Sequence, residues 1–322
     1  MALFNMLIGL PGSGKTVYAH DYIYGKDYCT IISSDDIRQE LWGDANDQQN
    51  PKAVFDEMYR RTVAALKAGK TVVYDATNLS AKCRKSTLNL LRRAIGNELT
   101  AVATLITCSI SECKRRQSDR DRKVPDEVID RMVRQFEAPW YNEGWNNIHI
   151  VSCGKKQNVD REHWRMLGEP HDNPHHTTSL EMHCANCMGN MSDIILANGD
   201  NFLRIDSIAA LLKEAAYQHD LGKHKTKVFH NSKGEPTDIA HYYSHNNVGA
   251  YLWLSGDKQG HWTDDEFLLI GALIQWHMQP YFLREDNGEY RAELKKWCDK
   301  RGFNDVFYLF VCLLHEADKA AH

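Results

Sequence analysis

The stretch Gly9-Leu10-Pro11-Gly12-Ser13-Gly14-Lys15-Thr16 is a complete G-x-x-x-x-G-K-S/T phosphate loop. An apolar run, Phe4–Ile8, precedes it and a helix-permissive stretch begins at Thr16, which is the strand–loop–helix context that the motif needs. Backbone N–H groups of such a loop close around triphosphate oxygens, the lysine reaches the β- and γ-phosphates, and the threonine hydroxyl can hold Mg²⁺. We therefore expect ATP with Mg²⁺ to bind at Gly12, Ser13, Gly14, Lys15 and Thr16.

Length and composition limit the kind of protein that carries this motif. A chain of 322 residues is long enough for two domains, and 43% hydrophobic with 25% charged residues is typical of a globular protein. The net charge of −4 does not indicate nucleic-acid binding, so a phosphate-binding surface must be local. Because the sequence shows neither a secretory leader nor an apolar run that could span a membrane, we expect a cytoplasmic protein of a bacterial or phage-infected cell, with no membrane partner and nine reduced cysteines.

The first half of the chain alternates apolar runs with helical stretches, which predicts a doubly wound parallel sheet in a P-loop α/β domain over residues 1–153. The expected strands are Leu7–Gly9, Thr30–Ile32, Thr71–Tyr74, Ala101–Ile106 and Ile148–Val151, and the expected helices are Thr16–Tyr24, Pro51–Ala68, Ala81–Ile95 and Pro125–Phe136. Phosphate ligands of such sheets bind at the carboxyl ends of the strands, where the phosphate loop falls.

The pattern changes after this domain. Residues 154–176 hold Gly, Pro, Asn and His with little periodicity and are interpreted as a connector, and from residue 177 the apolar residues fall at helical spacing. The expected helices are Leu180–Ala197, Ser207–His219, Ser244–Ser255, Asp264–Met278, Tyr290–Lys300 and Asn304–Ala321. Because no strand pattern is evident, residues 177–322 are predicted to form an all-α domain.

Three further groups of polar residues favour phosphoryl transfer over simple nucleotide binding. Asp35 follows the second strand and could accept a proton from an attacking hydroxyl, while Arg38, one helical turn on, could grip a phosphate. Asp75 and Asn78 end the third strand, with Arg84 on the next helix. The basic run KRRQSDRDRK at residues 114–123 could fold over the transferred group as a lid.

Each group also has a simpler interpretation. Asp36 is expected to be only a helix N-cap, and Asp35 could be a cap or turn residue as well. The basic run could be a solvated helix face, and Arg84 a surface residue. The pair Cys184 and Cys187 is interpreted as ordinary helix-face cysteines, because no second pair completes a zinc site.

Over residues 1–150 the chain resembles the 5′-hydroxyl polynucleotide kinases of phages and bacterial RNA-repair enzymes. The matching residues are the phosphate loop, the D-x-x-R of Asp35 and Arg38, the D-x-T-N of Asp75–Asn78 with Arg84, and the arginines before Val124-Pro125. The resemblance implies that Asp35 is the general base, that Arg38 holds the phosphate on the 3′ side of the terminal nucleotide, and that Arg116 and Arg120 contact the ATP phosphates, with Arg122 competing for the register of Arg120. It implies catalytic roles for Lys15, Asp35, Arg38 and Arg120, and polynucleotide binding by Asp35, Arg38, Asp75, Asn78 and Arg84.

Histidines and aspartates mark a second candidate site in the C-terminal half. His219 and Asp220 are adjacent at a helix end, where the histidine offers a nitrogen ligand and the aspartate could bridge two metal ions. Single histidines of this kind are more often satisfied core or surface residues, and the prediction depends on the whole set: His183, His219, Asp220, His245, His277 and Asp318.

The order H…HD…H…H…D in a helical domain resembles the HD phosphohydrolase superfamily, over about residues 175–322. The resemblance implies that His183, His219, Asp220 and Asp318 form the basic metal site, that His245 and His277 complete a second one, and that His219 and Asp220 are catalytic. One or two transition metals, Mn²⁺, Ni²⁺, Fe²⁺ or Co²⁺, are expected there. Lys223 could neutralise a phosphate oxygen, while His224 and His241 could line the pocket; His175, His176 and His230 receive no role.

The two resemblances together imply a bifunctional end-healing enzyme. The kinase would phosphorylate 5′-OH ends, and the HD phosphohydrolase would remove 3′-phosphate or 2′,3′-cyclic phosphate ends of RNA such as tRNA, or of DNA, for a separate nucleic-acid ligase. Two alternatives stay open: a small-molecule or nucleoside kinase fused to an HD nucleotidase, and a kinase regulated by a non-catalytic HD nucleotide sensor.

Overall fold

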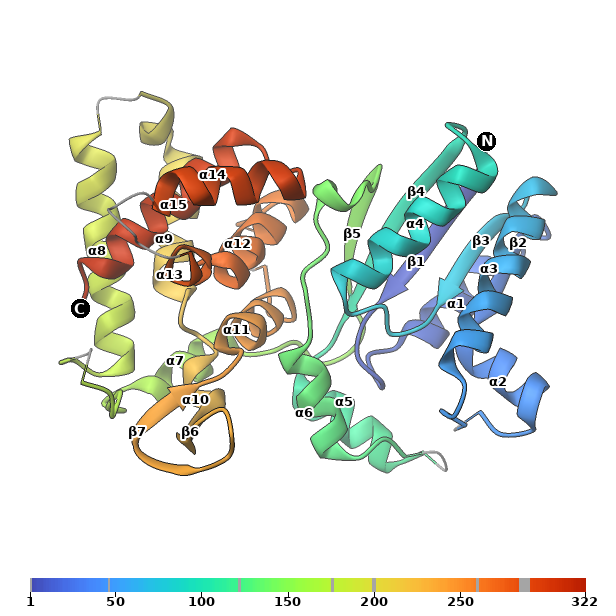
Figure 1. Ribbon diagram of the computed structural model, residues 1–322, viewed down its shortest axis with the longest axis horizontal. Coiled ribbons are helices and arrows are strands. Elements are labelled where there is room, and N and C mark those ends of the chain that lie inside the picture. The colour runs from blue at the N-terminus through green and yellow to red at the C-terminus, as the bar shows by residue number, and fades with distance from the viewer. Residues whose placement is uncertain are drawn as a thin grey trace. The chain divides into compact units, whose positions relative to one another are not determined.

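The structure is a computed structural model that describes residues 2–45, 47–120, 123–174, 177–198, 201–258, 261–283 and 290–322. The chain divides into two compact units, Met1–Lys156 and Gln157–His322. Figure 1 shows the parallel sheet and its helices in the N-terminal unit and a largely helical C-terminal unit. Among the described helices, none combines the length and the apolar character that crossing a bilayer requires.

The N-terminal unit is built on a five-stranded parallel sheet of order β2-β3-β1-β4-β5. Its strands are β1 (Ala2–Ile8), β2 (Cys29–Ser33), β3 (Thr71–Asp75), β4 (Leu99–Thr107) and β5 (Asn147–Ser152). Every residue of β3 is buried, which explains its continuous apolar run, because helices cover both faces of a doubly wound sheet. The predicted α/β fold of this half is confirmed.

Helices connect the strands of this sheet and carry its polar residues. They are α1 (Lys15–Ile23), α2 (Ser34–Trp42), α3 (Pro51–Lys67), α4 (Ala81–Ile95), α5 (Ile110–Ser118) and α6 (Asp126–Arg134), with the short 3-10 helix η1 (Tyr141–Glu143). Helices α2 and α5 were not among the helices expected from periodicity, although the interpretations of Asp36 as a cap and of the basic run as a helix face imply them. Both have nine residues and few apolar side chains, so neither shows a clear helical stripe.

The C-terminal unit is mostly helical. Its helices are α7 (Val159–Met166), α8 (Leu180–Ala197), η2 (Asn201–Arg204), α9 (Asp206–Gln218), α10 (Lys223–Thr226), α11 (His245–Leu254), α12 (Asp264–Trp276), α13 (Gln279–Phe282), α14 (Tyr290–Arg301) and α15 (Asp305–Lys319). The predicted helix Leu180–Ala197 has the predicted bounds, and the others begin and end within a few residues of those expected. The stretch interpreted as a connector, residues 154–176, contains α7, whose Met166 is fully buried in this unit.

The prediction of an all-α domain is wrong in one element. Strands β6 (Lys227–His230) and β7 (Pro236–Tyr242) form an antiparallel hairpin that follows α10 directly and lies beside it in Figure 1. Its strands are short and largely exposed, so they carry no long apolar alternation. The signal that could have revealed it is the turn, where the Asn231 side chain accepts hydrogen bonds from the backbone N–H groups of Lys233 and Glu235.

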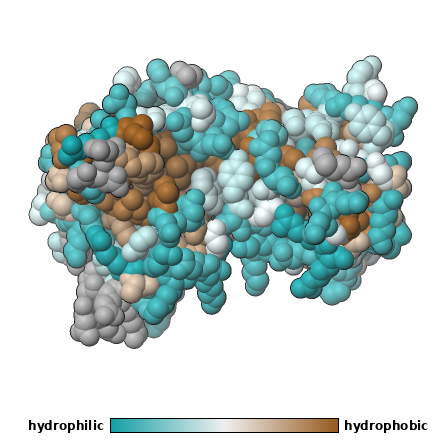
Figure 2. All heavy atoms as spheres, turned by 90° about the horizontal axis from the view of Figure 1, so that it is seen from above, coloured by the Kyte–Doolittle hydropathy of each residue, from teal (hydrophilic) through white to brown (hydrophobic). Residues whose placement is uncertain are grey.

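The surfaces of the two units differ in character. Figure 2 shows hydrophobic residues gathered on the visible face of the C-terminal unit, at the left, whereas hydrophilic residues dominate the visible face of the N-terminal unit. Exposed large apolar side chains of the C-terminal unit include Met182, Leu196, Phe229, Phe282 and Val306.

Candidate functional sites

The phosphate loop lies between β1 and α1, as the motif predicts. Gly12 has a φ of 81°, and a Cβ atom there would come within 2.6 Å of the Cys113 carbonyl oxygen, so the loop needs glycine at this point. The ammonium of Lys15 donates to the Leu10 carbonyl at 2.9 Å. Burial lowers the pKa of Lys15, and the nearby charge of Arg120 adds to this effect while Asp75 opposes it.

Asp75 lies beside the phosphate loop. Its Oδ2 accepts a hydrogen bond from the Thr16 hydroxyl at 2.9 Å, and its side chain is buried. Burial raises the pKa of Asp75, although Lys15 and Thr16 oppose that shift. A hydroxyl and a carboxylate at the end of a parallel strand are the donors that hold Mg²⁺ in P-loop proteins, so this placement fits a metal ligand better than the predicted contact with a polynucleotide.

Asp35 and Arg38 lie together at the start of α2, as their spacing predicts. Ser33 caps the helix by accepting from the N–H groups of Asp35 and Asp36, so the N-cap is Ser33, and Asp36, expected as the cap, lies within the first turn. A guanidinium nitrogen of Arg38 contacts Asp35 Oδ1 at 2.8 Å. The Arg38 side chain is 8% exposed and that of Asp35 is 52% exposed, which leaves the carboxylate accessible to a ligand.

Asn78 and Arg84 hold the protein backbone in this structure. The Asn78 amide donates to the Leu7 carbonyl at 2.7 Å. Arg84 is fully buried, donates to the carbonyls of Asn78 and Leu79, and pairs with Glu143, with Nε 2.7 Å from Oε2. A buried and paired guanidinium is not a surface group, so that alternative is wrong, while the contact of Arg84 with a polynucleotide stays a prediction. Sequence reasoning missed Glu143, because nothing in the local pattern links it to Arg84.

The basic run begins on α5, and part of it faces the phosphate loop. Arg116 donates to Glu112 Oε1 at 2.9 Å and to the Gly12 carbonyl at 3.2 Å. Arg120 follows the end of α5, and its effect on the pKa of Lys15 indicates that its charge is close to the loop. Arg122, the alternative to Arg120 as the second arginine that contacts ATP, lies outside the described residues.

Three of the predicted ligands converge in the C-terminal unit. Nε2 of His183 lies 3.0 Å from Asp318 Oδ1, and Nε2 of His219 lies 3.4 Å from the same oxygen. The two histidine Nε2 atoms are 3.3 Å apart. His183 comes from α8, His219 from the end of α9 and Asp318 from α15, and all three are buried, so the fold places one potential ligand atom from each around a common point.

Asp220 joins this group to a second one. Its Oδ2 lies 3.3 Å from His219 Nε2, while its Oδ1 lies 3.3 Å from His245 Nε2 and 3.7 Å from His277 Nε2. The two carboxylate oxygens therefore face different histidine groups, which is the geometry of a bridging ligand. Lys223 Nζ contacts Oδ2 at 2.6 Å.

The other ring nitrogens of the histidines are held by backbone carbonyls. The Nδ1 of His219 lies 2.7 Å from the carbonyl oxygen of Ala216. The Nδ1 of His245 lies 2.8 Å from that of Tyr242, and the Nδ1 of His277 lies 2.7 Å from that of Ile274. Such contacts fix the tautomer so that the Nε2 lone pair faces inward, as metal-binding histidines require.

Close backbone packing keeps the two groups together. A Cβ atom on Gly222 would come within 2.0 Å of the His245 carbonyl oxygen and 2.6 Å of the Gly249 nitrogen. Any side chain at this position would push the loop that carries Asp220 away from α11. The glycine in the H-D-L-G-K sequence is therefore part of the site through its lack of a side chain.

The electrostatics of the cluster call for cations. Burial acts to raise the pKa of Asp220, but Lys223 and His219 hold it well below its usual range. Burial likewise acts to raise the pKa of Asp318, and His219 with His183 lowers it. Burial lowers the pKa of His277 to about 3, with the neighbouring His245 adding to that effect. The two ionised carboxylates and the neutral imidazole of His277 are in the protonation states in which such side chains bind metals. Burial acts to lower the pKa of His219, but Asp220 and Asp318 raise it well above its usual range, so a cation bound there would displace a proton.

The cluster opens into a cavity of about 680 Å³. Asp220, Lys223, His245 and Asp318 are among its lining residues, together with residues of β7, Tyr281 and Phe282. Tyr281 donates to Asp318 Oδ2 at 3.0 Å, a contact that no sequence spacing indicates. His241 lines the cavity, whereas His224 contacts Glu162 at 2.8 Å; His175 and His176 lie outside the described residues.

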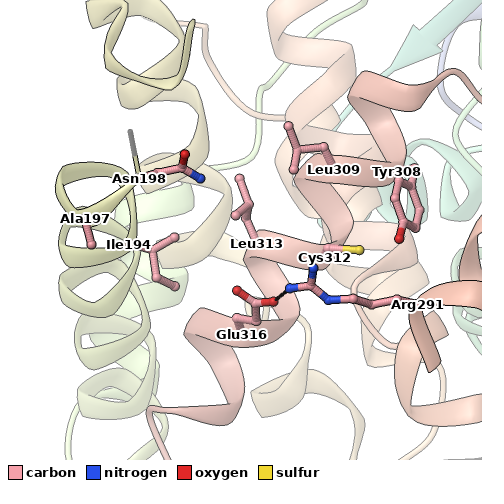
Figure 3. Close-up of a pocket in the computed structure, with 9 residues that line it drawn as sticks. All are labelled: Ile194, Ala197, Asn198, Arg291, Tyr308, Leu309, Cys312, Leu313 and Glu316. Carbon is pink, nitrogen blue, oxygen red and sulfur yellow. Dashed lines mark hydrogen bonds and ion pairs between the residues drawn. The ribbon is translucent and has the colours of Figure 1, made fainter. Parts of the chain in front are cut away.

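A second cavity of the C-terminal unit has different chemistry. It has a volume of about 350 Å³ and lies among α8, α14 and α15. Figure 3 shows Arg291 pointing toward Glu316, with which it pairs, beside the apolar side chains of Ile194 and Leu313. Among the described residues that line it there is no histidine or aspartate, so the features of a phosphoester site are stronger in the first cavity.

Comparisons with known proteins concern the N-terminal half. Residues 5–139 match a family model described as an AAA domain. L-seryl-tRNA(Sec) kinase of Methanococcus maripaludis is 23% identical over 147 residues, a match that covers 44% of this chain and 55% of that protein. The chain thus spans about half the length of this curated relative.

Two solved structures are also similar. A structure of the Pnkp1/Rnl/Hen1 RNA repair complex includes a chain that is 23% identical, with a TM-score of 0.36, covering 41% of this chain and 43% of that one. Gluconokinase from Sinorhizobium meliloti is 17% identical, with a TM-score of 0.32, covering 47% of this chain and 82% of that one. The N-terminal unit is a P-loop domain similar in sequence to a protein named as a kinase, and ATP and Mg²⁺ are implied for such a domain.

Proposed function

We propose that this protein heals nucleic-acid ends with two separate chemistries. Its N-terminal unit would transfer a phosphoryl group from ATP to a 5′-OH, and its C-terminal unit would remove a 3′-phosphate or 2′,3′-cyclic phosphate. Many ribonucleases leave these ends on RNA, and a ligase needs the opposite arrangement. The substrate would be RNA, tRNA included, and a separate ligase would act next. DNA ends are an alternative substrate that the same assay can examine.

The kinase half of the proposal is supported by the phosphate loop and the exposed carboxylate beside it. Asp35 would accept the proton of the 5′-hydroxyl, and Arg38, held 2.8 Å from it, would bind the neighbouring phosphate of the polynucleotide. Lys15, Arg116 and Arg120 would neutralise ATP oxygens, while Thr16 and Asp75, already hydrogen-bonded to each other, would hold Mg²⁺.

The phosphoesterase half is carried by one observation: the two oxygens of Asp220 face two different histidine groups. His183, His219 and Asp318 would hold one cation, His245 and His277 the other, and Asp220 would bridge them. Mn²⁺, Ni²⁺, Fe²⁺ or Co²⁺ held there would polarise the phosphate ester and supply hydroxide at neutral pH. Lys223 would place positive charge against a phosphate oxygen, and the Tyr281 hydroxyl would keep Asp318 oriented.

One assay tests both halves. The full chain is incubated with ATP, divalent ions and an RNA that carries a 5′-OH and a 2′,3′-cyclic phosphate, and both termini are identified. We expect a 5′-phosphate and loss of the terminal phosphate at the other end. Asp35→Ala should slow phosphorylation of the 5′-OH by about 100-fold or more while leaving processing of the other end intact, and His219→Ala should do the reverse.

The alternatives predict other outcomes. A nucleoside accepted in preference to an oligonucleotide would favour a small-molecule kinase with a nucleotidase. A purified protein that binds nucleotide in its C-terminal unit, yet shows no metal-dependent turnover of any phosphate ester, would favour a non-catalytic sensor. Unchanged phosphorylation of the 5′-OH by Asp35→Ala would overturn the assignment of the base.

A further inference from the structure

The hairpin β6–β7 carries a row of aromatic rings that starts at the phosphoesterase cavity. The rings of His241 and Tyr243 are stacked, with centroids 5.4 Å apart and planes only 5° from parallel. The ring of His230, at the end of β6, also stacks with Tyr243, with centroids 6.2 Å apart and an interplanar angle of 26°. His241 and Tyr243 line the cavity and His230 is exposed, so the row runs from the cavity toward solvent.

The hairpin is tied to the catalytic end of the same cavity. Lys223 Nζ contacts Asp220 and also lies 5.4 Å above the ring of Tyr242. The Tyr242 hydroxyl donates to the His171 carbonyl, and the Tyr242 carbonyl oxygen lies 2.8 Å from Nδ1 of His245. Strand β7 therefore positions one ligand histidine and the aromatic row together, which fixes the distance between the phosphate end and the rings.

The cavity is too large and too aromatic for a phosphate alone. Its volume of about 680 Å³ falls within the range of sites for nucleotide-sized ligands. Its lining offers Lys223 with histidines and aspartates, and also the flat apolar surface of Tyr243 and Phe282. Groups that suit a phosphate and rings that suit a base, in one cavity, match the chemistry of a nucleotide, because every base presents a face that stacks on an aromatic ring.

We propose that the row His241–Tyr243–His230 is a stacking track for the bases at the phosphorylated 3′ end of a single-stranded polynucleotide. The terminal base would lie against His241 and Tyr243 in the cavity, and the preceding base would lie toward His230. This proposal rests on the proposed phosphoesterase function and names its substrate as a polynucleotide end instead of a free nucleotide. Stacking reads no sequence, so the track would accept any base.

The test compares three substrates with the full-length protein: a single-stranded RNA with a 3′-phosphate, the same RNA lacking its two terminal bases, and a nucleoside 3′-phosphate. We expect the KM of the intact RNA to be the lowest. Tyr243→Ala should raise it by about tenfold with kcat changed little, since base stacking on one aromatic ring has this magnitude, and Tyr243→Phe should restore it. His230→Ala should raise the KM of the RNA while leaving that of the nucleoside 3′-phosphate unchanged.

Trp164→Ala is the matched control, because Trp164 is an aromatic side chain of the same unit that is 78% exposed on α7. Equal KM values for the intact and base-free RNA, or a Tyr243→Ala protein that behaves like Trp164→Ala, would overturn the track while leaving metal-dependent hydrolysis in place. Fluorescence anisotropy of the labelled RNA, measured with a metal chelator present, detects RNA binding that is independent of hydrolysis. If no substrate is hydrolysed but Tyr243→Ala weakens RNA binding about tenfold, the proposed function fails and the track stands.

Discussion

Arg84 shows how burial changes the meaning of a charged residue. Its guanidinium spans the Glu143 carboxylate and the carbonyls of Asn78 and Leu79, so it fixes the segment that follows β3. Removing one partner of a buried ion pair leaves the other charge without compensation. Arg84 therefore fixes the backbone around Asn78, whose amide in turn donates to the Leu7 carbonyl just before the phosphate loop.

We expect Arg84→Ala to lower the free energy of unfolding of the N-terminal unit by about 3–5 kcal/mol. The double variant Arg84→Met with Glu143→Leu should cost much less, because no charge is then left buried. Urea denaturation of the three proteins measures this. An Arg84→Ala protein of unchanged stability with weakened polynucleotide binding would support the direct contact that the sequence suggested.

Glu162 is a buried, paired charged residue of the C-terminal unit, as Arg84 is of the N-terminal unit. Its carboxylate, on α7, accepts contacts from His224 at 2.8 Å and Lys225 at 2.9 Å, immediately after Lys223. Burial acts to raise the pKa of Glu162, but these hydrogen bonds outweigh it and lower the pKa to about 2. Glu162 thus anchors the segment that follows the His219–Asp220 pair.

Because the pKa of Glu162 is lower in the folded than in the unfolded chain, its ionised form stabilises the fold above about pH 4.5, and this contribution fades as the pH falls toward 2. We expect Glu162→Gln to lose about 2 kcal/mol of unfolding free energy at neutral pH, less than the whole pKa shift would give because solvent screens its partners, and progressively less below pH 4.5. Denaturant titrations of both proteins at several pH values check this. A stability difference that stays constant as the pH falls would contradict it.

At the scale of elements, helix α2 carries the candidate base of the kinase. Its N-terminus depends on Ser33, whose hydroxyl accepts from the N–H groups of Asp35 and Asp36 at 3.3 Å. The cap therefore sets the direction in which Asp35 and Arg38 leave the helix. The same residue ends β2, so strand and helix meet at the point where the carboxylate is needed.

Replacing Ser33 by alanine should cost about 1 kcal/mol of stability through loss of the cap. It should also slow the phosphorylation of 5′-OH ends several-fold, because a small displacement of a catalytic group is costly. Ser33→Asp, which can still cap, should recover the stability. Steady-state kinetics and thermal melting are the measurements, and a Ser33→Ala protein with the turnover rate of the wild type would show that the cap does not position the base.

The elements that sequence could predict are those with strong periodicity. The bounds of α4 and α8 agree with the expected helices, and β3 lies where its apolar run predicts, because burial dictated their side chains over many residues. Periodicity did not predict helices α2 and α5 or the hairpin β6–β7. Their sequences are short and polar, because local turn chemistry and exposed positions determine them more than burial in a core does.

At the scale of the whole molecule, some residues of the candidate sites could be predicted from the sequence and others could not. The order of histidines and aspartates along the chain predicts the six candidate metal ligands, and the fold brings their potential ligand atoms into two groups. Their supporting partners, such as Tyr281 on α13 and the carbonyls that fix each imidazole, come from distant segments and leave no spacing to detect. Likewise, the pairing of Thr16 with Asp75 joins residues 59 positions apart.

The two proposed chemistries would reside in separate units, each with its own buried core. Such a division would let a chain of modest net charge act on two phosphate-bearing ends, because the positive groups are local to each candidate site. The central claim is that the C-terminal cluster holds two cations bridged by Asp220, since the hydrolytic half of the function depends on it.

Elemental analysis of the full chain after exposure to Mn²⁺ and removal of free metal tests this claim most directly. We expect about two Mn²⁺ ions per chain, about one in His277→Ala, where only the second group is disrupted, and less than one in Asp220→Ala, which removes the bridge. Trp164→Ala should match the wild-type protein. Equal metal content in all four proteins, or none in the wild type, would contradict the account.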